Sequence, residues 1–227
     1  MRELVAPPDW PRWFGVVLVG LIGVVAVYAY LFDGALFDYL VSEDNVLENL
    51  TAGLLLFGSM LWLFRFFKYQ KGKDFWWKAF QLFFAVLLFF GFAEEISWGQ
   101  RIIGFDTPEF FAKNNKQYEV GIHNLTYKGF SVNQWIFSFG LTIVIAIYYL
   151  FFRILYQKVN WIKQLTDLLG VPLPGIQQTI MMVAVVLLIL LIQHPKKWEI
   201  FECLFVIVFL ISIYVPNNYK KIWGRLP

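Results

Sequence analysis

The strongest constraint on the fold is the recurrence of apolar stretches that are long enough to cross a lipid bilayer. A membrane-spanning helix needs about 20 predominantly apolar residues to cross a hydrocarbon core of roughly 30 Å. We expect six such spans, at residues 13–32, 46–64, 75–97, 132–152, 175–193 and 198–215. Only 15% of the residues are charged, whereas about a quarter are charged in a soluble domain. The sequence therefore predicts an all-α, multi-pass membrane helix bundle, with residues 1–227 as a single domain.

The distribution of basic residues predicts the orientation of the spans. Lys and Arg accumulate in the short cytoplasmic loops of membrane proteins. With a cytoplasmic N-terminus, 13 of the 19 Lys and Arg residues fall on the cytoplasmic side, and so do both termini. This basic rim suits anionic lipid headgroups, whereas a nucleic-acid-binding protein needs a contiguous basic face that the sequence does not indicate. We expect membrane lipids and other membrane-protein subunits as partners, and no nucleic acid.

The most unusual polar feature is a pair of acids, Glu94 and Glu95, at the end of the third apolar stretch. Ionisable side chains within a bilayer are costly, so they are commonly functional or paired with another buried group. Counting about 1.5 Å per helical residue from the aromatic anchors Trp76 and Trp77 puts the outer boundary near Ser97. Glu94 and Glu95 then lie within about one helical turn of that boundary, on the membrane side.

Other spans bring polar residues to the same depth. The same count puts Glu48 just inside the outer boundary of the second span. The other polar residues expected at this level are Asn133, Gln134, His194, Glu199 and Glu202. Polar groups from five helices are thus predicted to converge in one layer at the outer leaflet.

Helical periodicity separates the two acids. Residues three, four or seven apart share a helix face, so Glu94, Ser97 and Arg101 are expected to form one stripe. Glu95 points about 100° away, with Trp98 near it. The two acids are therefore expected to have different partners.

The outer loop, residues 102–131, is expected to be ordered. Its sequence Asp-Thr-Pro-Glu at 106–109 is typical of a helix start, with a capping side chain, a proline in the first turn and an acid near the positive end of the dipole. A short helix lying on the bilayer surface is the expected structure. Further along, His123 follows Glu119 by four residues, so on a helix these two side chains would meet.

These residues define a candidate site. The candidate catalytic residues are Glu94, Glu95, Arg101 and His123, and the candidate substrate-binding residues are Glu48, Ser97, Gln100 and Asn124. In this hypothesis one acid of the pair is a general base or a metal ligand, Arg101 holds a phosphate or carboxylate, and His123 transfers protons. The alternative is a structural network of ion pairs and hydrogen bonds that locks three helices together, since buried charges are commonly paired.

A metal centre is a less favoured hypothesis. Glu95, His123 and His194 are the residues that could bind a divalent cation. The chain has no H-x-x-x-H or E-x-x-H spacing, so ordinary interfacial histidines are favoured and the cofactor stays unknown. The single Cys203 is more simply a small core residue than a nucleophile.

Several short motifs lie close together in the chain. They are the run EEISWGQR at 94–101, Thr-Pro-Glu at 107–109, Gln117, Glu119, the pair His123-Asn124, and the acidic segment 43–48. In these motifs the chain resembles a family of bacterial multi-pass membrane proteins that have no assigned activity. The resemblance implies a bacterial cytoplasmic (inner) membrane and a polar site at the outer leaflet, without naming a reaction.

Three classes of function remain open. The first is an enzyme or binding protein for a lipid or lipid-linked substrate at the outer leaflet, which accounts for the convergence of acid, amide and imidazole groups. The second is a non-catalytic subunit of a larger membrane complex, in which the polar layer is structural. A transporter is ranked last, because a pathway needs polar residues on both sides of the midplane and most spans lack them.

Overall fold

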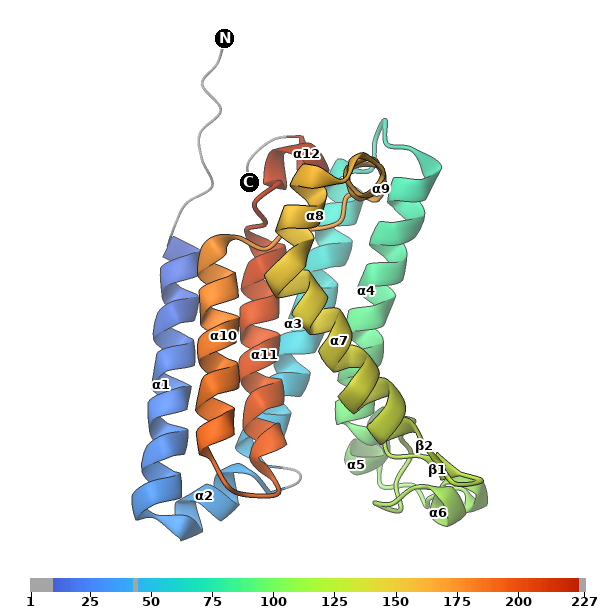
Figure 1. The fold of residues 1–227 in the computed structure, drawn as a ribbon. Coiled ribbons are helices and arrows are strands. Elements are labelled where there is room, and N and C mark those ends of the chain that lie inside the picture. Colours follow the sequence, from blue (N-terminus) through green and yellow to red (C-terminus); the bar gives the residue numbers. More distant parts are fainter. Residues whose placement is uncertain (1–9, 43–44, 225–227) are drawn as a thin grey trace.

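The computed structural model describes residues 10–42 and 45–224, which form a nearly all-helical structure (Figure 1). The long helices are α1 (Trp10–Phe32), α3 (Val46–Tyr69), α4 (Phe75–Glu95), α10 (Ile176–Leu191) and α11 (Lys197–Tyr214). Another long helical segment, Asn133–Lys158, consists of η2 (Asn133–Gly140), α7 (Leu141–Ala146), η3 (Ile147–Phe151) and α8 (Phe152–Lys158). The shorter elements are α2 (Gly34–Leu40), η1 (Ser97–Gly99), α5 (Gln100–Ile103), α6 (Glu109–Asn114), β1 (Thr126–Tyr127), β2 (Phe130–Ser131), α9 (Asn160–Leu169) and α12 (Tyr219–Trp223).

Several helices have the dimensions of membrane spans. Within the described residues, four are long and apolar enough to cross a bilayer, namely α1, α3, α4 and the segment Asn133–Lys158. α10 is a shorter apolar helix of 16 residues, and α11 carries charged residues in its first turns. The protein is therefore a membrane protein with a nearly all-α fold, while the six-span topology stays a prediction.

The first helix illustrates why the bundle suits lipid rather than water. The buried face of α1 includes the small residues Gly15, Gly23, Ala26 and Ala29. Its outward face carries large exposed apolar side chains, among them Phe14, Leu21, Val24 and Leu31. In water such a surface would favour aggregation, whereas in a bilayer it contacts lipid chains that are equally apolar. The small residues on the inner face let neighbouring helices approach closely.

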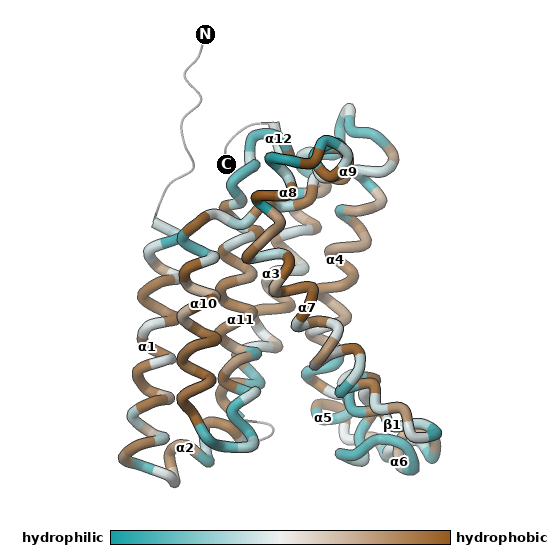
Figure 2. The backbone as a smooth tube through the Cα atoms, in the orientation of Figure 1, coloured by the Kyte–Doolittle hydropathy of each residue, from teal (hydrophilic) through white to brown (hydrophobic). Residues whose placement is uncertain are grey.

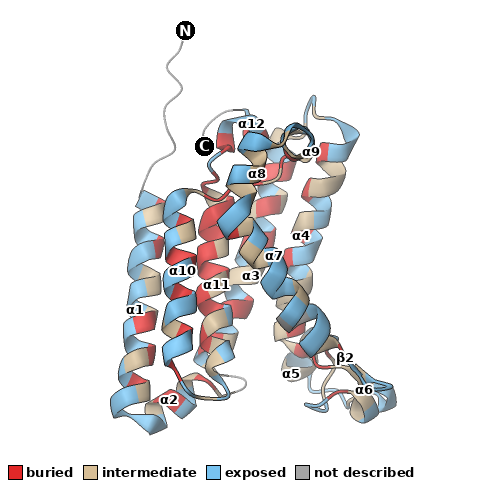
Figure 3. Cartoon of the chain, viewed as in Figure 1, coloured by how far each residue is buried: buried red, intermediate tan, exposed pale blue. Residues whose placement is uncertain are grey.

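α11 lies at the centre of the bundle, in contact with α1, α3 and α10. Figure 3 shows buried residues concentrated on this helix. A Cβ atom at Gly15 of α1 would lie only 1.8 Å from Cδ1 of Ile211, and one at Gly58 of α3 would lie 2.5 Å from Cδ2 of Leu210. The two glycines thus permit the close approach of α1 and α3 to the central helix.

The segment Asn133–Lys158 is only loosely attached to the other helices. It crosses the bundle obliquely (Figure 1), and only 6% of its apolar 18-residue window is buried. Its polar contacts with other helices include those of η3, where Tyr149 Oη lies 3.1 Å from Ser212 Oγ and Thr179 Oγ1 donates to the Tyr149 carbonyl at 3.0 Å. Most of its apolar surface is therefore available to lipid or to another protein.

The bundle has two polar ends, which Figure 2 shows as hydrophilic regions on either side of a hydrophobic band. We call the end with α9, α12 and the α3–α4 turn the terminal end (Figure 1). The opposite end contains α2, the α10–α11 connection, α5, α6 and the β1–β2 hairpin, and we call it the loop end. The predicted outer loop and the candidate site residues belong to the loop end.

A buried arginine fastens the helices together at the terminal end. Arg65 of α3 donates from Nη1 to the Ile213 carbonyl (3.1 Å) and from Nη2 to the Tyr214 carbonyl (3.0 Å), which are at the C-terminus of α11. The guanidinium carbon also lies 4.6 Å from the ring centre of Tyr214 and 5.5 Å from that of Tyr219. A cation at this position satisfies carbonyls that the helix leaves free and complements the helix dipole.

We predict that Arg65→Met lowers the free energy of unfolding by about 3 kcal/mol, because two buried carbonyls lose charged donors. The measurement is reversible unfolding of the purified protein in detergent. Lys68→Met, one turn further along α3 at an exposed position, is the control and should change stability by less than about 0.5 kcal/mol. Equal stability of the Arg65→Met and Lys68→Met variants would contradict this role of Arg65.

Candidate functional site

The candidate site begins where the chain breaks out of α4. The helix ends at Glu95, and Ser97, Trp98 and Gly99 then adopt φ values of 49°, 53° and 85°. Two consecutive non-glycine residues in this left-handed region are energetically costly, so other contacts must hold them. α4 thus ends two residues before the predicted end of the third span, because the chain turns here before α5.

The carboxylate of Glu94 is buried and accepts four hydrogen bonds. Its Oε2 atom accepts from the backbone N–H groups of Ile122 (2.7 Å) and His123 (2.8 Å), and it pairs with Nδ1 of His123 at 2.9 Å. Its Oε1 atom accepts from the indole Nε1 of Trp98 at 2.5 Å. Trp98 had been expected beside Glu95, and the turn after α4 places it on Glu94 instead. Glu94 thus ties α4 to the turn after it and to the loop.

Arg101 forms the second junction of the network. Its Nε and Nη2 atoms donate to Oε2 of Glu119 at 3.1 and 2.9 Å. Its Nη1 atom donates to Oε1 of Glu48 (2.5 Å) and to the Glu95 carbonyl (3.2 Å). Burial lowers the pKa of Arg101, but Glu48 and Glu119 outweigh this effect and raise it above its usual value. The side chain therefore stays charged and joins α3, the end of α4 and the loop.

Ser97 and Gln100 also hold the loop. Ser97 donates from Oγ to Oε2 of Glu119 at 2.5 Å, which helps to retain the unusual backbone of the turn. Gln100 donates from Nε2 to Oγ1 of Thr107 (2.7 Å) and accepts at Oε1 from the Val120 N–H (2.7 Å). Both residues had been predicted to bind substrate, and in the structure both use their side chains within the chain.

Asn124 connects the loop to the following helical segment. Its Nδ2 atom donates to Oε1 of Gln117 and to Nε2 of His123, the latter at 2.7 Å. Its Oδ1 atom accepts from Nδ2 of Asn133, the first residue of η2, at 3.3 Å. Because Nδ1 of His123 lies on Glu94, both nitrogens of the imidazole have a hydrogen-bond partner.

The loop itself is only partly as predicted. α6 begins at Glu109 directly after Pro108, but no side chain caps its first turn. From 117 to 127 the chain forms turns and then enters the β1–β2 hairpin instead of a helix. Glu119 and His123 therefore do not pair through helical spacing, because Glu119 binds Arg101 and His123 binds Glu94.

Glu95 differs from its neighbour in having no such partner. Its carboxylate accepts no hydrogen bond from the residues that the structure describes. Its electrostatic neighbours include the carboxylates of Glu202, Glu48 and Glu199, and one cation, Arg101. Glu202 of α11 is exposed although the residues after it are buried in the core. Acidic residues of α3, α4 and α11 are thus electrostatic neighbours at Glu95, whereas Asn133 contacts Asn124 and His194 contacts Phe37 and Asp38.

The two histidines considered for a metal site have separate partners, since His123 pairs with Glu94. In the described part of the chain, no group of three or more His, Cys, Asp and Glu residues is arranged to hold a metal ion. His194 instead packs its ring against Phe37 (4.9 Å between ring centres) and lies 3.7 Å from Oδ1 of Asp38. Cys203 is fully buried in the core, as expected for a small apolar residue.

Two members of the network, Glu119 and Trp98, were not among the predicted site residues. Glu119 is the only acid between residues 110 and 131, in a stretch with three lysines. A single acid in such a stretch could have indicated a specific partner. Trp98 follows Glu94 by four residues, a spacing that brings side chains together on a helix. The indole reaches Glu94 even though the helix has ended.

Comparisons with protein-family models, with curated proteins and with solved structures find no match to this chain. The resemblance to a bacterial membrane-protein family therefore stays a prediction.

We predict that Glu94→Gln loosens the loop. The amide of glutamine has only one acceptor oxygen, and its NH2 group would face donors that now bind the carboxylate. We therefore expect the free energy of unfolding to fall by about 2 kcal/mol. Trypsin should then cleave faster at the exposed lysines Lys113, Lys116 and Lys128. Glu109→Gln is the matched control, since Glu109 forms only an exposed pair with Lys113. Cleavage of the Glu94→Gln variant at the wild-type rate would show that Glu94 does not hold the loop.

The pairing of His123 with Glu94 predicts a pH dependence. Burial lowers the pKa of His123, but the Glu94 carboxylate, with Glu202 and Glu119, raises it above the usual value of about 6.5. A raised pKa in the folded state stabilises the protein below about pH 6.5, and this contribution is lost as the pH rises through the folded-state pKa. NMR titration of a His194→Gln variant, which keeps only His123, should give a midpoint above 6.5, and Glu94→Gln should lower it. A midpoint that Glu94→Gln leaves unchanged would refute the pairing.

Proposed function

We propose that this protein crosses a bacterial cytoplasmic membrane six times and binds a lipid or lipid-linked molecule at its loop end. The six spans are α1, α3, α4, the segment Asn133–Lys158, α10 and α11. α10 and α11 support this topology because they pack alongside α1 and α3 in the same bundle. The basic residues of the terminal end support a cytoplasmic location for that end and for both termini. The loop end then lies at the outer leaflet.

The observation that carries the binding proposal is the contrast between two adjacent acids. Glu94 is saturated by four donors, whereas the Glu95 carboxylate accepts no hydrogen bond from the described residues. A carboxylate near the membrane boundary is costly unless it is paired or protonated. Glu95 is therefore suited to a ligand that supplies donors from outside the chain.

The charge around Glu95 indicates the kind of ligand. Its neighbours include three carboxylates and one cation, and that cation, Arg101, already pairs with Glu48 and Glu119. Acidic groups thus outnumber cations at this position, so negative charge exceeds positive charge when these groups are ionised. A ligand with a cationic group, such as the ammonium of an aminophospholipid headgroup or of a lipid-linked amine, would balance it.

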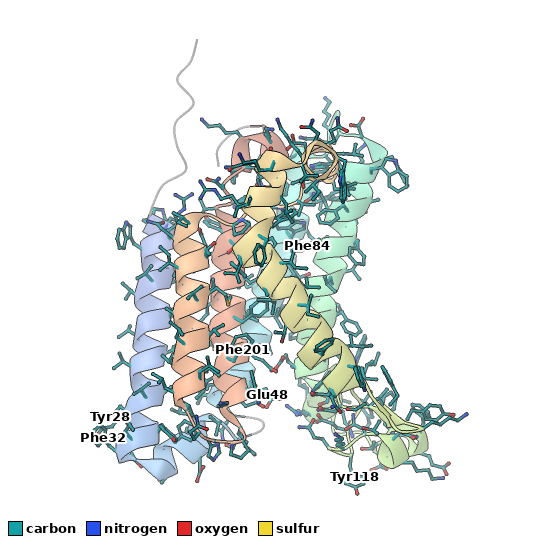
Figure 4. All side chains as sticks on the ribbon, viewed as in Figure 1. Tyr28, Phe32, Glu48, Phe84, Tyr118 and Phe201 are labelled. Carbon is teal, nitrogen blue, oxygen red and sulfur yellow. The ribbon has the colours of Figure 1, made fainter. Side chains whose placement is uncertain are left out.

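Apolar surfaces beside this position could receive the acyl chains of such a ligand. The rings of Phe201, Phe205 and Phe209 stack along α11, with centres 6.1 and 5.6 Å apart. In Figure 4, the labelled Phe201 and Glu48 lie between α11 and the loop-end half of the oblique helical segment. The weak packing of Asn133–Lys158 leaves this side accessible from the lipid phase.

The structure favours binding over a reaction that uses all four predicted catalytic residues. The polar atoms of Glu94, Arg101 and His123 form hydrogen bonds with other residues of the chain. These side chains are therefore suited to positioning the loop. Glu95 is the one member of this group whose carboxylate keeps its acceptor sites for a ligand. A general base acting on a bound lipid would be this residue.

The second candidate is a non-catalytic subunit of a membrane complex. It is favoured by the segment Asn133–Lys158, of whose apolar window only 6% is buried. A span with so few neighbours in its own chain offers a large surface to partner helices. In that case the Glu94 and Arg101 contacts are purely structural.

We predict that Glu95→Gln/Glu202→Gln lowers retention of phosphatidylethanolamine at least ten-fold, because the ammonium group of the lipid loses two carboxyl groups as acceptors. The readout is native mass spectrometry of protein from nanodiscs with equal phosphatidylethanolamine and phosphatidylglycerol. Glu109→Gln/Asp106→Asn, which removes two exposed loop acids, is the control. Equal retention in both variants, together with a stoichiometric partner in detergent pull-downs, would replace lipid binding by the subunit function.

A further inference from the structure

A second polar site lies at the terminal end, far along the bundle from the loop end. A cavity of about 480 Å³ opens there between the start of α1, α8, the segment before α12, and α12 itself. Its polar lining includes Arg12, Tyr156, Asn217, Lys220 and Lys221. None of these residues belongs to the site proposed at the loop end, so a test of one site does not depend on the other.

The cavity is strongly basic. Among the lining residues that the structure describes, three are cations and none is acidic. The neighbouring acid Asp167 is engaged by Lys221, whose Nζ atom donates to its Oδ2 at 2.8 Å. The described lining of the cavity therefore carries more positive than negative charge, which suits an anion.

The walls of the cavity are fixed by hydrogen bonds. Lys221 also donates to the Tyr156 hydroxyl at 2.7 Å, so its position is set from two sides. The buried Asn218 accepts from the Leu173 N–H (2.9 Å) and donates to the Val171 carbonyl (2.8 Å). A binding site held in this way loses little conformational entropy when a ligand enters.

The position of the cavity relative to the membrane indicates where the anion comes from. Arg12 lies in the first turn of α1 between Trp10 and Trp13, which are both exposed. Exposed tryptophans at the end of an apolar helix are typical of the headgroup level of a bilayer. Basic pockets between helices at this level are suited to phosphate groups of lipids.

We infer that this cavity binds a phosphate group, and that its source is the headgroup of an anionic phospholipid in the leaflet at the terminal end. Arg12 offers a planar guanidinium that can bind a phosphate with two hydrogen bonds. Lys220 and Lys221 supply ammonium groups from α12, and Asn217 lies beside them. A bound lipid would join the start of α1 to α12.

The test uses the full-length protein in phosphatidylcholine nanodiscs with increasing fractions of phosphatidylglycerol. Retained phosphatidylglycerol is counted by native mass spectrometry. We expect Arg12→Gln/Lys220→Gln to lose about five-fold in apparent affinity for each cation removed. Lys71→Gln/Lys163→Gln is the matched control, because it removes two exposed cations from the same end but outside the cavity. Equal loss in both double variants would overturn the site, since it would show only a general attraction to anionic lipid.

A second arm separates lipid from soluble phosphate. Inorganic phosphate is titrated at constant ionic strength against the wild type in pure phosphatidylcholine nanodiscs, and thermal unfolding is followed. Stabilisation by phosphatidylglycerol that inorganic phosphate does not reproduce supports the lipid source. Stabilisation by phosphate alone would overturn that source. If the double variant does not fold, Lys220→Gln, a change of one exposed side chain, replaces it and should still lose about five-fold.

Discussion

The buried carboxylate of Glu94 is the interaction on which the arrangement of the loop end depends. It is charged and withdrawn from solvent, so its stability requires donors, and the chain supplies them from two backbone amides, an imidazole and an indole. The amides of Ile122 and His123 lie in a loop that has little regular structure of its own. Glu94 therefore replaces the hydrogen bonds that secondary structure would otherwise give this part of the loop.

Two adjacent acids thus have opposite environments. α4 ends at Glu95, and the chain turns back through Ser97, Trp98 and Gly99. This turn brings the loop onto Glu94 and leaves the next side chain facing Glu202 and Glu48. Arg101 reinforces the division, because it pairs with Glu48 and Glu119 and contacts only the backbone carbonyl of Glu95. The hydrogen bonds of Glu94 and Arg101 that order the loop therefore leave the carboxylate of Glu95 outside this network.

The sequence predicts the parts of this structure that depend on local chemistry. Apolar length locates α1, α3 and α4, and a count along the third span places the acid pair near the membrane boundary. The turn at 97–99 is not predictable from periodicity, because Ser97 and Trp98 adopt positive φ values that only contacts with Glu119 and Glu94 stabilise. Those contacts join residues more than 20 positions apart or cross a helix end, where spacing rules do not apply.

The link between Asn124 and Asn133 has a mechanical consequence. The helix that begins at Asn133 has few neighbours inside the protein, so its tilt is set largely by the bilayer around it. A thinner membrane makes such a helix lean further, and its first turn carries the attached hairpin with it. A change in the tilt of this helix would therefore be transmitted, through Asn133 and Asn124, to the loop whose backbone binds Glu94.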